Sequence, residues 1–461
     1  MDGFSKEVLS RLPLAEGTLA LLSWVLEPEF LDEVFENHRG RSYESELSFP
    51  VMVSLIQDAL LEHQGSAHQA MKRSDELNVS YQAAYGKLRR VPISLSRGFF
   101  AQATDRLREV FPDGAGILLP ASLRDFDVIA VDGKKIKGAA KRLKPARAYA
   151  GTPLGGKGLA ALDLRTRLML AFNAHPDGET NDAPLIPGLL PQVRERASRR
   201  RLWIADSQFC DLRQPVLFAE ENDAYLIRFH PKNSFQRAAD VPVREGVDPH
   251  GRRYREEWGF LGQAKHKRLY VRRITLFREG AEDVIVITNL LDADQYPAAD
   301  LLEVYLARWG IERVFQQVTE VFHLQQLISS SPEGTIFQLG FCMLLYNLIQ
   351  VVRGYVAEAQ RKAAETISLE ELFYDVHREL TSLSTLIDSP EVVDHFPPAQ
   401  TALALKTYLR ELFASVWEDR WLKSPKKKIP KSTEPKKPIN GGHTSIYRIL
   451  RTAKQNAAKD V

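Results

Sequence analysis

The sequence has few cysteines and no long apolar run. Only Cys210 and Cys342 occur among 461 residues, too few for a disulfide framework or a cysteine-rich zinc site, which favours a reducing cytoplasm. No stretch of about twenty apolar residues is present. The first residues, MDGFSKEVLSRLPLAEG, lack the uninterrupted apolar core of a signal peptide. We therefore expect a cytoplasmic protein with no membrane span.

The net charge is close to zero, at +3, but the cations are clustered. The run from Gly133 to Arg147 contains no acidic residue and these basic ones: Lys134, Lys135, Lys137, Lys141, Arg142, Lys144 and Arg147. Two further basic stretches cover 252–278 and 423–437. Clustered cations of this kind neutralise phosphates and release counterions, which favours DNA binding. The alternative for each stretch is a solvated loop.

Residues 1–120 are predicted to be helical and to form a DNA-binding region. LSFPVMVSLIQDALLEH repeats apolar residues at helical spacing. SYQAAYGKLRRV predicts a short helix that begins at Ser80 and stops before Pro92. Its aromatic and basic residues suit the recognition helix of a helix-turn-helix unit. A basic surface helix of a bundle is the alternative.

From residue 121 onward, strand-like and helix-like segments alternate, which predicts an α/β sheet. FDVIAVDG predicts a strand ending at Asp132, and RLWIAD predicts one ending at Asp206. GTPLGGKG between them predicts a turn that places Lys157 near DNA. Residues 231–280, rich in Arg, Gly, Tyr and Trp, predict a β-rich insertion.

The remaining third of the chain is predicted to be mainly helical. Long helices are expected over about 298–323 and 335–360. The resulting organisation is a helical region over 1–120, a catalytic α/β domain over 121–350 with its insertion at 231–280, a helical C-terminal region over 351–422 and a basic tail over 423–461. The last residues, GGHTSIYRILRTAKQ, predict a small docking helix in that tail.

Three acidic residues suit metal-dependent phosphodiester chemistry. Two divalent cations about 3.5–4 Å apart need oxygen ligands, and magnesium prefers carboxylates. Asp132 and Asp206 at strand ends meet this need, and a third carboxylate lies in YLARWGIERVFQQVTEVFHL at Glu312. Spacings of three, four and seven put Tyr305, Arg308, Glu312 and Thr319 on one helical face. From spacing alone, a salt-bridged helix face and turn-forming aspartates remain the alternative.

The motifs VDGKKIKG, ADSQFCDL and YLARWGIERVFQQV, in this order, resemble the DDE transposases of bacterial insertion sequences, in the group with a Tyr-Arg-Glu-Lys signature. The resemblance covers about residues 125–350. It implies a ribonuclease-H-like catalytic core with a β-rich insertion, preceded by an α-helical N-terminal domain. Asp132, Asp206 and Glu312 would be the catalytic, metal-binding triad for two Mg²⁺ or Mn²⁺ ions per active site.

The resemblance also implies a reaction and partners. The reaction is metal-dependent strand cleavage and strand transfer at the ends of an insertion sequence, in cut-and-paste transposition. The partners are double-stranded DNA, at transposon ends and target, and a second copy of the chain on that DNA, in the nucleoid of a bacterial cytoplasm. Tyr305 and Arg308 would contact the phosphate backbone, with Lys134 and Lys135 also near DNA. Trp258 is the candidate to hold a flipped base, with a core Trp as the alternative.

The sequence departs from the signature at one position. The final lysine falls on Thr319, so one charge-assisted phosphate contact is lost. Either Lys134 or Lys135 substitutes for it, or the element is weakened. A catalytically decayed or domesticated transposase-derived DNA-binding protein is therefore one alternative function. A stand-alone metal nuclease with the same triad is another.

Overall fold

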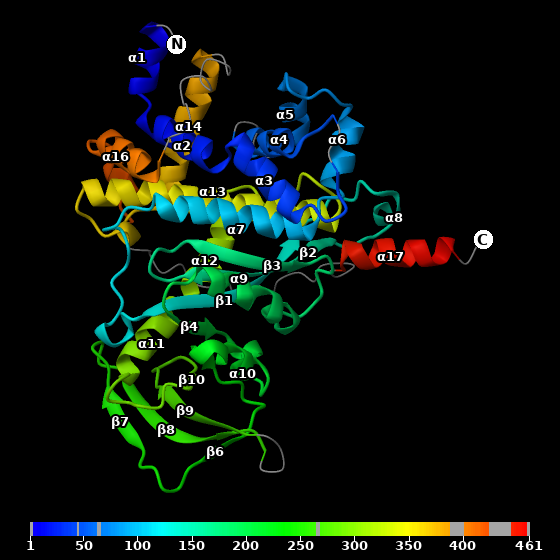
Figure 1. Ribbon diagram of the computed structural model, residues 1–461. Coiled ribbons are helices and arrows are strands. Elements are labelled where there is room, and N and C mark those ends of the chain that lie inside the picture. The colour runs from blue at the N-terminus through cyan, green and yellow to red at the C-terminus, as the bar shows by residue number, and fades with distance from the viewer. Residues whose placement is uncertain are drawn as a thin grey trace.

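The computed structural model describes residues 3–43, 46–61, 66–263, 268–387, 401–423 and 444–458. Its centre is a mixed sheet with helices on both faces, and a helical layer lies above it (Figure 1). The strands are β1 (Phe126–Lys137), β2 (Leu154–Asp163), β3 (Met169–His175), β4 (Arg200–Ala205), β5 (Ala224–Arg228), β6 (Phe235–Arg237), β7 (Arg244–Val247), β8 (Arg253–Leu261), β9 (Leu269–Leu276) and β10 (Val284–Thr288). The described residues therefore form the α/β architecture that the alternating segments predict.

The sheet has two halves that differ in strand direction. Its order is β3-β2-β1-β4-β5-β10-β9-β8-β6, and β7 pairs with β8. In the first half, β1, β2 and β3 are antiparallel neighbours, whereas β1, β4 and β5 run parallel. In the second half, every pairing from β5 through β10, β9 and β8 to β6 is antiparallel. Strands β6 to β9 lie within 231–280, where a β-rich insertion is expected.

The N-terminal region is helical, as predicted from its apolar periodicity. It contains α1 (Gly3–Ser10), α2 (Pro13–Val25), α3 (Pro28–His38), α4 (Phe49–Leu61), α5 (Ala67–Arg73), α6 (Tyr81–Leu88) and α7 (Ile93–Glu109). Ser80 caps α6, because its hydroxyl accepts a hydrogen bond from the backbone N–H of Ala83 at 3.2 Å. Pro92 stands directly before α7. The predicted start and stop of α6 are therefore confirmed.

The helices that follow the N-terminal region cover the sheet and extend from it. They are α8 (Lys144–Arg147), α9 (Ile186–Arg196), α10 (Gln214–Phe218), α11 (Ala298–Ala307), α12 (Trp309–Glu320), α13 (Pro332–Ala359), α14 (Leu369–Leu386), α16 (Ala402–Phe413) and α17 (Ile446–Ala457). Short 3-10 turns occur at Ala121–Leu123, Ala183–Leu185, Ser207–Phe209, Glu220–Asn222, Ala364–Thr366 and Asp419–Trp421. The predicted helix over 298–323 is two helices, because α11 and α12 meet at Arg308.

Each face of the sheet has its own hydrophobic cluster, because side chains alternate along a strand. On one face, Ala130 and Ile204 belong to the large cluster that also contains residues of α7, α12 and α13. On the other face, Ile129 and Trp203 pack with residues of α9 and α10. The alternation assigns even-numbered residues of β1 and β4 to the side of α12 and α13.

Helix α13 is the buried centre of the molecule. Among the described residues it is the one helix long and apolar enough to cross a membrane, and its most apolar window is 100% buried inside the protein. It passes between the helical layer and the sheet (Figure 1). The sequence, read for apolar runs alone, does not single it out, since polar residues such as Gln338 and Asn347 interrupt it.

The turn predicted for GTPLGGKG is wrong, because LGGKG is the first half of β2. A Cβ atom on Gly155 would lie 2.7 Å from Thr335 Oγ1, and one on Gly158 would lie 2.7 Å from Leu339 Cδ2. The glycines therefore let α13 approach the strand closely. Lys157 is 6% exposed, so the expected position near DNA is also wrong for this side chain.

Candidate active site

Asp132 and Asp206 lie side by side on neighbouring parallel strands. The last paired residues of β1 and β4 are Ala130 and Ile204, and each aspartate stands two residues farther along its strand. The pairing of β1 with β4 ends at this last pair. The period of two puts the Asp132 side chain on the face of Ala130, and the charge of Asp206 acts on Asp132. Adjacent strands lie about 4.8 Å apart. The two carboxylates are thus brought together from positions 74 apart in the sequence.

The prediction that β1 ends at Asp132 needs correction. The strand continues to Lys137, because residues Ile129 to Lys137 remain paired with β2 after the pairing with β4 has ended. Asp132 therefore marks the end of one pairing and not of the strand. Asp206 does follow the last residue of β4, and its carboxylate accepts a hydrogen bond from the Gln208 backbone N–H at 3.0 Å.

The third carboxylate comes from the helix that packs against β1. Glu312 lies in the first turn of α12, where the positive end of the helix dipole favours a negative charge. Its Oε1 accepts a hydrogen bond from Arg308 Nη2 at 3.1 Å. The salt bridge that the spacing allows is therefore present, and it lies at the same site as the two aspartates.

The pKa of Asp132 is affected by the charges of both other carboxylates, so the three lie close enough to interact. Burial raises the pKa of Asp132 to about 7. The hydrogen bond from the Gly133 backbone N–H, at 2.9 Å, and the charge of Arg308 lower this pKa, whereas the charges of Asp206 and Glu312 raise it. Two cations, Arg308 and Lys134, thus lie near three carboxylates. The excess of negative charge favours binding of a further cation.

Arg308 lies among these carboxylates with unused donors. It is 4% exposed, and its Nε and Nη1 are buried without a hydrogen-bond partner. Burial opposes the charge of Arg308, but the nearby Tyr305, Asp132, Glu312 and Asp206 outweigh it and raise its pKa. Tyr305, in the last turn of α11, is 3% exposed, and its ring centroid lies 5.9 Å from the guanidinium. Both signature residues are therefore at the carboxylates, with little surface of their own.

The two predicted lysines lie on opposite faces of β1. Lys134 shares the face of Asp132, and its Nζ donates to the Phe315 carbonyl of α12 at 3.3 Å. The Thr319 hydroxyl donates to the same carbonyl at 2.6 Å. The ammonium of Lys134 therefore lies beside the position where the signature has its lysine. Lys135 is exposed on the other face.

The sequence analysis missed a buried ion pair next to the aspartates. Lys157 of β2 pairs with Asp182, and both side chains are buried. A Cβ atom on Gly133 would lie 2.2 Å from Asp182 Oδ1, so Asp182 fills the space beneath the residue that follows Asp132. Asp182 also bonds the Gln208 side chain, which lies 3.5 Å from Asp206 Oδ2. The register of Lys157 opposite Lys135 becomes visible only after β2 is assigned correctly.

Trp258 lies in the antiparallel half of the sheet. It is 8% exposed, and its indole N–H donates to the Leu291 carbonyl at 2.9 Å. The guanidinium carbons of Arg272 and Arg244 lie 5.7 Å and 5.8 Å from its ring centroid. In this arrangement the ring is packed between cations, as a core Trp would be. Holding a flipped base would require these neighbours to move.

The carboxylates suit a divalent metal in kind, but this arrangement does not gather them around one point. Magnesium and manganese take oxygen ligands, and Asp132, Asp206 and Glu312 supply carboxylate oxygens on one face of the sheet. Within the described ranges, no three His, Cys, Asp or Glu side chains are gathered around a single point closely enough to hold a metal ion. The Arg308 guanidinium lies among the three carboxylates instead, and its buried unpaired nitrogens show that this arrangement leaves donors unsatisfied.

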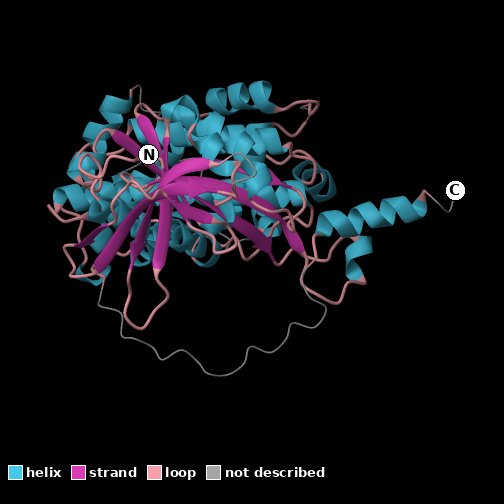
Figure 2. Ribbon diagram, turned by 90° about the horizontal axis from the view of Figure 1, so that it is seen from below, coloured by secondary structure: helices cyan, strands magenta, loops and turns pink. Residues whose placement is uncertain are grey.

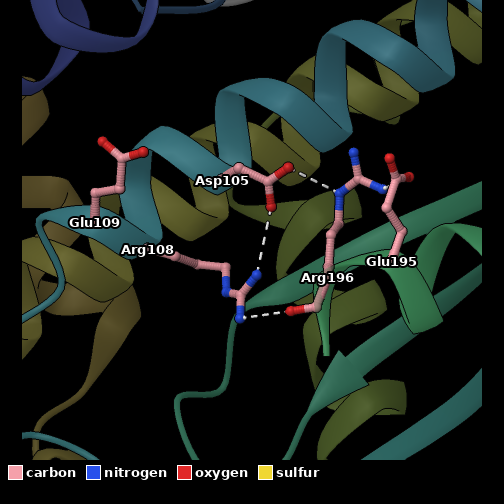
Figure 3. Close-up of a pocket in the computed structure, with 5 residues that line it drawn as sticks. All are labelled: Asp105, Arg108, Glu109, Glu195 and Arg196. Atoms are coloured by element: carbon pink, nitrogen blue, oxygen red, sulfur yellow. Dashed lines mark hydrogen bonds and ion pairs between the residues drawn. The ribbon is translucent and has the colours of Figure 1, made fainter. Parts of the chain in front are cut away.

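A separate hollow lies between the C-terminal ends of α7 and α9. It encloses about 550 Å³ and is lined by Asp105, Arg108, Glu109, Glu195 and Arg196. Figure 3 shows that its charged groups bond one another: Asp105 lies 3.4 Å from Arg108 Nη1 and 2.9 Å from Arg196 Nε. These pairs neutralise most of its charge. The hollow therefore lacks the charge excess that marks the Asp132 site.

The fold and the site together define a mixed α/β protein with a carboxylate site at the centre of its sheet. Residues 124–348 match the family model described as the transposase DDE domain, and all three carboxylates lie within this segment. Among solved structures, the chain is similar to piggyBac transposase in a cryo-EM structure of its synaptic complex with hairpin DNA. That similarity has 12% identity and a TM-score of 0.38, over 83% of this chain and 86% of that chain. No curated protein matches the sequence.

Proposed function

We propose that this protein is a DNA transposase that cleaves and transfers DNA strands at the ends of a mobile element. The observation that carries this proposal is that the charges of Asp206 and Glu312 act on Asp132, just past the pairing of β1 with β4 and inside the segment that matches the transposase DDE domain. Paired aspartates alone occur in many structures. A third carboxylate that shares their electrostatic environment, with one arginine among them, supports a site for divalent metal.

Each residue of the site has a proposed task. Bound Mg²⁺ or Mn²⁺, two per site, would activate the attacking oxygen and stabilise the leaving oxygen. Asp132, Asp206 and Glu312 would hold the metal. Arg308 would donate its free Nε–H and Nη1–H groups to a phosphate oxygen, since a guanidinium binds phosphate through more than one hydrogen bond. Tyr305 would orient Arg308 and contact the same backbone.

The assignment of the core, the insertion and the family group follows from the resemblance of the sequence motifs. We propose that β3-β2-β1-β4-β5 is a ribonuclease-H-like core and that β6 to β9 are its insertion. We also propose membership of the bacterial insertion-sequence group with the Tyr-Arg-Glu-Lys signature, with Lys134 compensating for Thr319. The support for this compensation is the single Phe315 carbonyl that accepts hydrogen bonds from both side chains.

The proposed partners are double-stranded DNA and a second copy of the chain. Transposon ends and target would both be bound as duplexes, and two protomers would act on paired ends in a bacterial cytoplasm. Helix α6 supports the DNA-binding proposal for residues 1–120, because Tyr81, Arg89 and Arg90 are exposed on or directly after it. The basic segment over 424–443 lies outside the described residues.

The test uses the full-length protein, Mg²⁺ or Mn²⁺, and DNA that carries the flanking ends of its own gene. We expect metal-dependent nicking at the boundary of the element by the wild type. Asp132→Asn should reduce the rate at least about a thousandfold, because loss of metal-based charge stabilisation removes several kcal/mol. Asp248→Asn, a buried aspartate of the antiparallel half, is the matched control and should cleave normally. Cleavage that persists in Asp132→Asn would refute the triad.

A second function is supported by Thr319. Its hydroxyl is already bonded to the carbonyl of Phe315, so it cannot replace a lysine as a charged phosphate ligand. A decayed or domesticated transposase would bind end DNA without cleaving it. In that outcome Thr319→Lys is the decisive variant: restored nicking identifies a weakened enzyme, whereas unchanged inactivity identifies a DNA-binding protein.

A further inference from the structure

Helix α17 is held to the body by its N-terminal part. Thr444 and Ser445, directly before it, are held by β2 and by the loop after β3: the Leu154 backbone N–H donates to the Thr444 carbonyl at 2.8 Å, and the Gly178 backbone N–H donates to Ser445 Oγ at 3.1 Å. Ile446 is buried, and the residues from Arg451 onward are mostly exposed. Figures 1 and 2 both show α17 projecting away from the body.

Two acid-free segments meet where α17 leaves the body. Residues 444–458 contain no Asp or Glu, and the run over 133–147 contains none either. Helix α17 contacts α8, which lies in that run. The nearest acidic residues, Asp177 and Glu179, are engaged by Arg448 of α17. Apart from Arg448, which is paired with these acids, the exposed cations on these two helices are Lys144, Arg147, Arg451 and Lys454, and we call them the basic face.

The basic face is continuous along the chain with the candidate active site. Asp132 lies in β1, which ends at the exposed Lys137, and residues 138–143 connect β1 to α8. A rise of about 3.3 Å per residue puts Lys137 roughly 16 Å along the strand from Asp132. Helix α17 adds a rod of about 18 Å. A duplex carries one charge per about 1.7 Å of its axis, so a surface of this length faces many phosphates.

We propose that the basic face binds the phosphate backbone of duplex DNA outside the active site. This inference rests on the proposed function, because it assigns a second contact surface for the same substrate. The binding would be independent of sequence, since phosphate contacts position a duplex without reading its bases. Helix α17 would extend the footprint beyond the reach of α8 alone.

A second copy of this chain is the competing occupant. Ile449 and Leu450 are half-buried on α17 and would supply apolar contacts to a partner helix. The charge of α17 favours DNA over a second copy. Its exposed side has Arg451 and Lys454 and no acidic residue, so the α17 helices of two copies would repel each other. A polyanion matches that surface directly.

The experiment compares two double variants of the full-length protein with equal loss of charge. Arg451→Gln with Lys454→Gln alters the basic face. Arg361→Gln with Lys362→Gln alters two exposed cations just past the C-terminal end of α13 and serves as the control. Binding to a duplex is measured without metal at several salt concentrations. Two lost phosphate contacts should reduce the slope of log K against log salt by about 1.8, since each contributes about 0.9.

The outcomes separate this proposal from its alternatives. The slope should fall in the α17 double variant and not in the control, and Arg451→Lys should retain the wild-type slope. Equal slopes in both double variants, or no binding by the wild type, would overturn the proposal. A lower molar mass by light scattering with an unchanged slope would identify a second copy as the occupant. Because metal is omitted, failure of cleavage refutes the proposed function and leaves this result intact.

Discussion

Buried charges in the antiparallel half of the sheet are balanced, whereas those at the Asp132 site are not. In β8 and β9, Arg272 Nε donates to Glu256 at 2.7 Å and Nη1 donates to the Tyr296 carbonyl at 2.7 Å. Both side chains are buried. At the Asp132 site, three carboxylates lie near Arg308. The first arrangement has one base for its acid, whereas the second has more carboxylates than cations.

This difference separates two uses of buried charge. A buried ion pair of one acid and one base holds strands in register, and breaking it is costly. An excess of carboxylates costs stability in the empty protein, because burial and like charge both oppose ionisation. Such an excess is maintained where a cation binds. The comparison therefore predicts opposite effects on stability for charge removal in the two regions.

The largest effect on stability is expected from Arg272→Met. The substitution leaves Glu256 buried without its partner, so the free energy of unfolding should fall by about 3–5 kcal/mol. Denaturant titration of the full-length protein measures the change. The double variant Arg272→Met with Glu256→Leu is the control and should recover most of the loss, since two apolar side chains replace the pair. An equal loss in the double variant would mean that the pair is not the cause.

Asp132→Asn should act in the opposite direction. Burial raises the pKa of Asp132 to about 7, above its ordinary value of 3.8, so the stabilisation present at low pH is lost as pH rises through about 7. Asn does not ionise, so at pH 8 without metal the variant should melt at a higher temperature than the wild type. Metal should reverse the order: at 100 times its dissociation constant it stabilises the wild type by about 2.7 kcal/mol, and the variant by less.

Thermal melts at pH 5 and pH 8, with and without Mn²⁺, check this prediction. Asp248→Asn is the control for an aspartate that keeps a cation partner, since Asp248 pairs with Arg252. If the Asp132→Asn variant without metal is less stable than the wild type at pH 8, the Asp132 site does not differ from the antiparallel half in the way proposed.

The sequence predicts the order of elements well and their pairing only in part. Apolar periodicity and capping residues locate α4 and α6, because these signals are local. The turn expected at GTPLGGKG is wrong because its four glycines suggest a loop, whereas α13 packs on three of them in a strand. Contacts such as that between Gly155 and Thr335, 180 positions apart in the sequence, decide that strand. No local pattern contains this information.

For the candidate site too, local sequence patterns do not contain the long-range contacts. Asp132, Asp206 and Glu312 are each found by their position in a motif. What the motifs lack is their proximity, which follows from the pairing of β1 with β4 and from the charges that act on Asp132. The continuation of β1 past Asp132 depends on its pairing with β2. The sequence pattern also does not predict the break between α11 and α12 at Arg308.

The ion pair of Lys157 and Asp182 combines features of both regions. Like Arg272 and Glu256, it joins one acid to one base, but it lies next to the carboxylates of the Asp132 site. Asp182 bonds Gln208, whose backbone N–H holds Asp206, and it lies against Gly133. We expect Asp182→Asn to weaken Mn²⁺ binding about tenfold, as loss of a carboxylate that supports a metal ligand does. Its effect on stability should be smaller than that of Arg272→Met, because Asn still accepts a hydrogen bond from Lys157. Calorimetric titration of metal measures the affinity, with Asp248→Asn as the control. Unchanged Mn²⁺ affinity would place Asp182 with the purely structural pairs.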